Sequence, residues 1–134
     1  MSADERGGPQ VFCELYVTDV AQSLAIFRDA LGLALVRDEG DLAVLNLGPT
    51  ELLLNAADPA TLEQGNPLRD APPGAPRGVG VELGIVVDDL AAALVRVSAL
   101  DSVVVTSAAE SRPWGAQDFR FLHPDGFYVR VSDA

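Results

Sequence analysis

The chain has 134 residues, of which 49% are hydrophobic and 22% charged, and a formal net charge of −11. This length and balance predict one compact globular domain rather than a disordered chain. The acidic charge, with nine arginines and no lysine, excludes nucleic acid and anionic membrane as the default partners. It favours a cationic or amine-bearing ligand instead.

Neither the cysteine content nor the targeting signals indicate an oxidising compartment. The single cysteine, Cys13, cannot form an internal disulfide, and its alternation with Leu15 and Val17 predicts a buried, inert thiol. Residues 1–10 lack the apolar segment of a signal peptide, so we expect a flexible N-terminal tail. No run of about eighteen apolar residues occurs, which predicts a cytoplasmic protein without a membrane span.

Residues 11–57 predict a first module in the order strand, helix and three strands. A β-rich segment at 11–17 precedes Asp19, which we expect to cap a helix with Gln22 as its capping-box partner. Gly32 is expected to end that helix. Short strands are expected at 33–37, 42–47 and 51–56.

Residues 58–78 interrupt the pattern with five prolines and three glycines. We expect a linker here, with one helical turn at 61–64. A linker of about twenty residues is long for a compact domain, which indicates a functional or mobile segment. The sequence leaves its role open.

The same order of elements begins again over residues 79–134. A strand at 79–87 leads into a helix capped by Asp89, and strands are expected at 103–106, 117–122 and 127–132. A shift of 70 positions places Asp19 on Asp89. The alternative is a chance match of two common β-α units. The repeat predicts an α+β fold: two tandem β-α-β-β-β modules in one structural domain, forming a curved mixed eight-stranded sheet around a cavity.

Three segments carry a resemblance to a known family: residues 14–32, residues 81–90, and the short motifs Arg-Pro-Trp-Gly at 112–115 and Pro-Asp-Gly at 124–126. They resemble the vicinal oxygen chelate superfamily, which includes glyoxalase I, extradiol dioxygenases, fosfomycin-modifying enzymes and bleomycin-resistance proteins. The resemblance implies the paired-module fold and a homodimer, because members of the superfamily usually pair so that each cavity is completed.

Enzymes of this superfamily carry His or Glu metal ligands at equivalent places in each module. The resemblance places these positions at Phe12, Glu82 and Arg130 and, by a looser alignment, at Leu54. Only Glu82 has a donor oxygen, and an arginine brings positive charge to where a metal would sit. The resemblance therefore implies no metal and no other cofactor, as in the bleomycin-resistance group. His123, on the opposite strand face, is expected to be structural or solvated.

Strand alternation places further side chains on the face of the former ligand positions. The expected ligand-binding residues on these strands are Phe12, Glu14, Tyr16, Glu82, Tyr128 and Arg130. We predict that Glu82 and Arg130 form an ion pair across the former metal position. The alternative is that both are solvated strand residues.

The leading functional interpretation is a metal-free protein that sequesters a small cationic aromatic ligand or antibiotic. Trp114 and Phe12 would contact its planar part and Glu14 an amine; alternatively Trp114 belongs to the core and Glu14 solubilises an edge. The second interpretation is a lyase, isomerase or dioxygenase-like enzyme, using Glu82 with Glu14 at an atypical metal site, or Glu82 with Tyr128 as acid and base. A housekeeping or regulatory role is the third.

Overall fold

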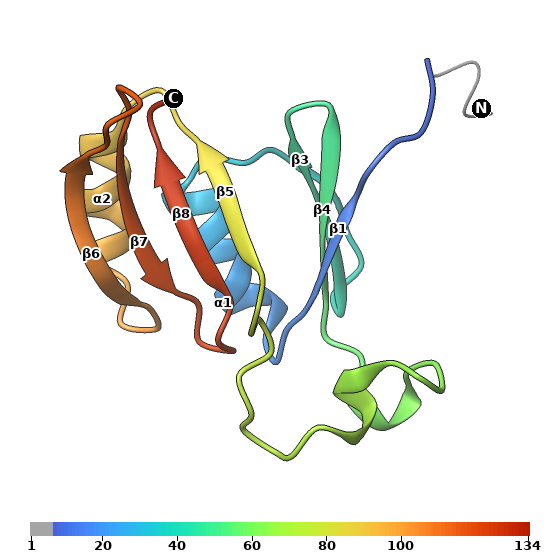
Figure 1. The fold of residues 1–134 in the computed structure, drawn as a ribbon. Helices are drawn as coiled ribbons and strands as arrows, with labels where there is room; N and C mark the ends of the chain where they lie inside the picture. Colours follow the sequence, from blue (N-terminus) through green and yellow to red (C-terminus); the bar gives the residue numbers. More distant parts are fainter. Residues whose placement is uncertain (1–6) are drawn as a thin grey trace.

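The computed structural model describes residues 7–134, so most of the expected tail at 1–10 lies outside the described residues. The elements follow the expected order twice (Figure 1). The first module contains β1 (Cys13–Tyr16), α1 (Val20–Leu24), a π-helical turn (Ala25–Ala30), β2 (Leu35–Asp38), β3 (Leu42–Leu47) and β4 (Thr50–Asn55). The second contains β5 (Glu82–Val86), α2 (Leu90–Ser98), β6 (Val104–Ser111), β7 (Gln117–Leu122) and β8 (Tyr128–Ser132). The prediction of an α+β fold with two β-α-β-β-β modules is confirmed.

The eight strands divide into two four-stranded sheets with the same internal order, β1-β4-β3-β2 and β5-β8-β7-β6. In each sheet the first strand of the module pairs in parallel with the last, and the remaining pairs are antiparallel. No strand pair among residues 7–134 joins the two sheets, so the hydrogen-bonded units are four strands wide. Figure 1 shows α1 and α2 together behind the second sheet, with the first sheet beside α1.

Both helices begin at the expected aspartates. Asp19 accepts a hydrogen bond from the amide of Gln22 at 3.1 Å, and Asp89 accepts one from the amide of Ala92 at 3.0 Å. These caps satisfy amides that the first helical turn leaves unpaired. Gly32, with φ of 82°, follows the first helical segment in the left-handed conformation that ends helices. Among residues 7–134, no helix has the length and apolarity needed to cross a membrane.

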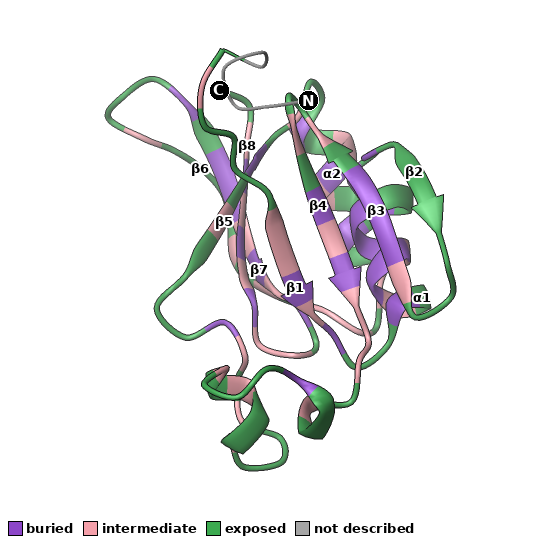
Figure 2. Cartoon of the chain, turned by 90° about the vertical axis from the view of Figure 1, so that its right-hand side faces the viewer, coloured by how far each residue is buried: buried purple, intermediate pink, exposed green. Residues whose placement is uncertain are grey.

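One face of each sheet belongs to a single core shared by both modules, and Figure 2 shows buried segments in both. Alternating strand residues pack there with both helices. The strand contribution includes Leu15, Leu52, Leu54, Phe119, Phe121, Val129 and Val131, and the helical contribution includes Ile26, Phe27 and Val97. Because the cluster spans both modules, neither closes a core alone. The opposite face of each sheet, here called its open face, is left to carry polar groups.

Polar contacts also join the first module to the β7–β8 turn. The amide and hydroxyl of Thr18 donate to the Asp125 carboxylate at 2.8 and 2.6 Å. His123 Nδ1 accepts from the amide of Asp125 at 2.9 Å, so Nε2 carries the proton and donates to Ser23 Oγ at 2.8 Å. Burial lowers the pKa of His123 to about 4. The structural role predicted for His123 is therefore confirmed.

The segment at 58–78 packs against both modules. It forms two short 3-10 turns, Pro59–Thr61 and Pro67–Asp70, in place of the single expected turn. Its far end lies directly on the β7–β8 turn, since a Cβ added to Gly78 would approach the Cα of Phe127 to 2.7 Å. Gly78 thus lets the backbone of the linker come close enough to shape the adjoining surface.

Candidate functional site

The open faces place most of the expected site residues around two adjoining hollows. The β1 hollow has a volume of about 540 Å³ and is lined by residues 11–16 with Asn66, Pro67, Leu68, Arg77, Gly78, Val81 and Phe127. The β5 hollow has a volume of about 660 Å³ and is lined by Pro76, Gly78, Val79, Gly80, Val81, Glu82, Arg120, Leu122, Gly126 and Tyr128. Gly78 and Val81 belong to both linings, so the two hollows share a border.

The β1 hollow brings together the three residues expected from the first strand. Phe12 is 65% exposed, and Glu14 and Tyr16 follow it along the same face. Asn55 donates a hydrogen bond to Glu14 Oε2 at 3.0 Å, which orients the carboxylate. Cys13, which was expected to be buried, is only half-buried and contributes to the lining of this hollow, and burial raises the pKa of its thiol. This hollow offers aromatic surface and one carboxylate.

The β5 hollow is bordered by a cluster of three charged side chains. Arg130 Nη2 lies 3.8 Å from Glu82 Oε2, which confirms the predicted ion pair. Arg120 Nε lies 3.7 Å from the other oxygen of the same carboxylate. The sequence interpretation missed Arg120, although the signal was present: the turn residue Asp125 lies midway between the two arginines, so hairpin pairing sets them opposite one another.

Two guanidinium groups face the Glu82 carboxylate in this cluster, and both also act on the nearby Asp118 carboxylate, which Arg112 binds. The side chains of Glu82, Arg120 and Arg130 are 36%, 26% and 34% exposed. Arg120 Nε is shielded from solvent and has no hydrogen-bond partner among the described residues. Its guanidinium carbon lies 6.0 Å from the centre of the Tyr128 ring. The arrangement suits a ligand that brings hydrogen-bond acceptors.

Leu54 does not occupy the open face, which corrects its assignment as a former ligand position. It is fully buried in the core. Glu14 pairs with Leu53 in the first sheet, and Gly84 pairs with Arg130 in the second. Since the repeat matches Glu14 to Gly84, the counterpart of Arg130 is Leu53. The alignment of the two modules in the sequence was shifted by one residue at β4, and a shift of one residue exchanges the two faces of a strand.

The residues at the former ligand positions do not fit a metal ion. Phe12, Leu53 and Arg130 offer no lone pair to a cation, and the Glu82 carboxylate already lies within 4 Å of two guanidinium groups. Residues 7–134 contain no group of three or more His, Cys, Asp or Glu side chains placed to hold an ion. A divalent cation bound at Glu82 would therefore meet two positive charges and a single carboxylate.

Trp114 lies apart from the other expected site residues. It is 64% exposed in the β6–β7 connection and lines neither hollow. Arg112 holds this connection by donating to both oxygens of the nearly inaccessible Asp118 carboxylate, at 2.7 to 3.0 Å. These hydrogen bonds keep the pKa of Asp118 below its ordinary value. Asp118 lies beside the carboxyl end of β8, whereas Tyr128 lies at its amino end, about 13 Å away by strand rise.

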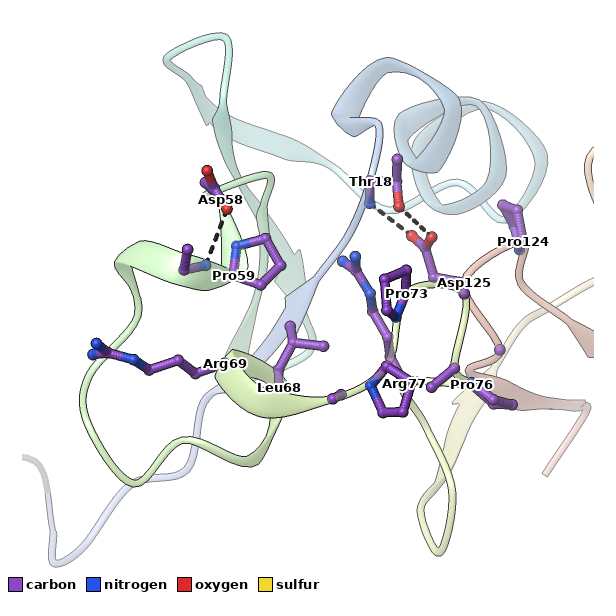
Figure 3. Close-up of a pocket in the computed structure, with 16 residues that line it drawn as sticks. Thr18, Asp58, Pro59, Leu68, Arg69, Pro73, Pro76, Arg77, Pro124 and Asp125 are labelled. Atoms are coloured by element: carbon purple, nitrogen blue, oxygen red, sulfur yellow. Dashed lines mark hydrogen bonds between the residues drawn. The ribbon is translucent and has the colours of Figure 1, made fainter.

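A third hollow, of about 550 Å³, lies between the linker and the β7–β8 turn (Figure 3). Its charged groups hold the linker in place. Arg69 Nη1 donates to the carbonyl of Leu62 at 2.9 Å, and Arg77 Nη1 donates to the carbonyl of Tyr16 at 3.1 Å. The Asp125 carboxylate is engaged by the first module. The charged groups of this hollow are therefore engaged within the chain, whereas five of the seven expected site residues line the two hollows of the open faces.

Comparisons with known proteins agree with this fold. Residues 10–131 match the family model of the Glyoxalase/Bleomycin resistance protein/Dioxygenase superfamily. The search of curated proteins gave no match.

Three solved structures illustrate the similarity. A protein of unknown function from Agrobacterium tumefaciens str. C58 has 24% identity and a TM-score of 0.72, with 94% of each chain covered. TioX from Micromonospora sp. ML1 has 15% identity and a TM-score of 0.67, with 93% of this chain and 98% of TioX covered. Lactoylglutathione lyase from Agrobacterium tumefaciens has 24% identity and a TM-score of 0.62, with 92% of each chain covered. At these identities the likeness concerns the fold alone.

Proposed function

The chain belongs to the glyoxalase/bleomycin resistance protein/dioxygenase superfamily, and we propose that it binds and sequesters a small organic molecule without a metal ion. The observation that carries this proposal is the replacement of the metal-binding set by Glu82 between two arginines. The two adjoining hollows have the size typical of sites for small ligands. Sequestration requires only binding, which these open faces can provide.

The β1 hollow supports the expected cationic aromatic ligand. Glu14 offers a carboxylate to an amine, and the rings of Phe12 and Tyr16 offer surface to a planar group. The net charge of −11 would also raise the local concentration of a cation. We propose resistance to such a compound as the biological role, by analogy with the bleomycin resistance proteins of the superfamily.

The enzyme alternatives have less support from the geometry. Glu82 and Tyr128 are partners on neighbouring strands, so an acid–base pair is adjacent. However, a general base must be free to take a proton, and the Glu82 carboxylate faces two guanidinium groups. The atypical metal site of Glu82 with Glu14 would need ligands from two different hollows.

The binding proposal can be tested by titrating the purified protein with phenethylamine and with the neutral phenethyl alcohol. We expect the amine to shift the backbone NMR signals of residues 11–16 and to bind about tenfold more tightly than the alcohol. Glu14→Gln should abolish this preference. Glu51→Gln, which removes a charge from the exposed surface of β4, is the matched control. Binding of neither probe, or stoichiometric Zn, Fe, Mn or Ni in the purified protein, would contradict the proposal.

A homodimer forms part of the proposal. β1 and β5 are edge strands, and Val86 on β5, which lines neither hollow, is 66% exposed. Unpaired edges and exposed apolar side chains favour association of two copies. Sedimentation equilibrium at micromolar concentration should give a dimer mass, and a monomer mass would count against pairing.

A further inference from the structure

We infer that the β5 hollow, which Arg120 lines and beside which Arg130 lies on the neighbouring strand, contains a subsite for the carboxylate of an organic ligand, bound by these two arginines. This inference rests on the proposed small-molecule function and names a chemical group of its ligand. It is independent of the amine expected at Glu14, because that residue lines the other hollow. Three observations support the subsite: the pairing of Arg120 with Arg130, the unused N–H donors of both guanidinium groups, and the apolar lining of the hollow.

Strand register places the two arginines directly opposite one another, because Arg120 on β7 pairs with Arg130 on β8. Like charges at directly opposite positions destabilise a sheet. The same positions of the first module hold Val44 and Leu53, which also pair with each other. The topology therefore forms without this charge pair, which the Glu82 carboxylate contacts and the Asp118 carboxylate also attracts.

The donors of the two guanidinium groups are largely unused. Neither side chain donates a hydrogen bond to any group in residues 7–134, since the contacts to Glu82 at 3.7 and 3.8 Å are longer than hydrogen bonds. Each guanidinium has five N–H groups, whose geometry matches the two oxygens of a carboxylate. An incoming carboxylate would supply the acceptors that the chain does not provide.

The rest of the hollow fits the apolar body of such a ligand. Val79 and Val81 are 79% and 64% exposed, and Leu122 also lines the hollow. Gly84 on β5 pairs with Arg130, and a Cβ built there would meet nothing within 4 Å, so the open face has free space beside the backbone of Arg130. Guanidinium donors beside apolar surface match an organic monocarboxylate better than an inorganic dianion, which would bring no apolar body to that surface.

The subsite can be tested with phenylacetate, the neutral phenylacetamide and inorganic phosphate at low ionic strength. The readout is the NMR shift of the arginine Nε–Hε signals and of the backbone amides of residues 79–82. We expect phenylacetate to bind at least about tenfold more tightly than the amide, and phosphate to bind more weakly than phenylacetate. Arg130→Gln and Arg120→Gln should each abolish the preference for the acid.

The matched control is Arg37→Gln, because Arg37 lies on β2 of the other sheet with its side chain 59% exposed. The control should keep the preference for phenylacetate, and circular dichroism melts should verify that each variant is folded. If the acid and the amide bind equally, the subsite is refuted while small-molecule binding stands. If phosphate binds as tightly as phenylacetate, the site recognises charge alone and the organic carboxylate is refuted. If no probe, including phenethylamine, binds either hollow, the proposed function itself fails.

Discussion

The two modules share one topology but differ in what their open faces carry. On the core face, Leu54 of the first module corresponds to Val131 of the second, and both are fully buried. On the open face, Leu53 corresponds to Arg130. Packing thus requires apolar residues at the core positions of both copies, whereas the open positions are free to diverge.

This divergence separates two chemical environments within one domain. The first module contributes aromatic surface and the Glu14 carboxylate, while the second contributes the cluster of Glu82 with two arginines. A ligand that spans the shared border of the hollows would therefore meet a negative end and a positive end. The shared topology positions the two open faces, and under the proposed function their different side chains would select the ligand.

The largest expected effect on stability comes from substitutions at two neighbouring residues of β4, one on the core face and one on the open face. Leu54→Ala should lower the free energy of unfolding by about 3 kcal/mol, because it leaves a cavity in the shared core. Leu53→Ala, on the open face, should lower it by only about 1 kcal/mol. Urea denaturation of both variants measures the difference. Equal losses would mean that the register of β4 has been assigned incorrectly.

The second largest expected effect is a dependence of stability on pH. It arises in the second module, where His123 occupies the position equivalent to Leu47 of the first. Its pKa is lowered from 6.5 to about 4 in the folded chain. The unfolded chain therefore binds the proton first as the pH falls, and stability is lost between about pH 7 and pH 4. Between pH 7 and pH 5 this loss is about 2 kcal/mol.

His123→Gln removes this titration, so its free-energy difference from the wild type should shrink by about 2 kcal/mol between pH 7 and pH 5. Ser23→Ala is the control, because it removes the hydrogen bond to Nε2 and keeps the imidazole. Its difference from the wild type should stay nearly constant over that range. An unchanged difference for His123→Gln would show that the imidazole is not the titrating group.

Much of the fold could be predicted from the sequence because it depends on local signals. Asp19 and Asp89 cap their helices as expected, since a cap needs only a side chain and an amide three residues on. The Pro-Asp-Gly turn likewise marks the last hairpin. The capping aspartates recur at a spacing of 70 positions, which is why the paired modules could be recognised.

Fewer features of the candidate site could be predicted from the sequence, because the site depends on the register between strands that are distant in the chain. The Glu82–Arg130 pair followed from alternation along the strands, yet Arg120 needed the pairing of β7 with β8. The neighbours of Trp114 in the sequence predicted a place in the cavity, whereas the structure leaves it exposed in the β6–β7 connection and outside both hollows. The open faces form two hollows because the linker packs between them, and no local sequence pattern predicts that packing.

The substitution with the smallest expected effect on stability is also the clearest test of whether Arg120 serves binding or folding. Arg120→Val gives the second module the residue that the first has at the equivalent position, Val44. It removes the like-charge pair, worth up to about 1 kcal/mol, and the contacts of Arg120 with the Tyr128 ring and the Glu82 carboxylate, together worth about 1 kcal/mol. The free energy of unfolding should therefore change by no more than about 0.5 kcal/mol, while phenylacetate binding falls about tenfold. A large loss of stability would instead show that Arg120 is part of the packing, and the asymmetry of the open faces would then reflect folding rather than binding.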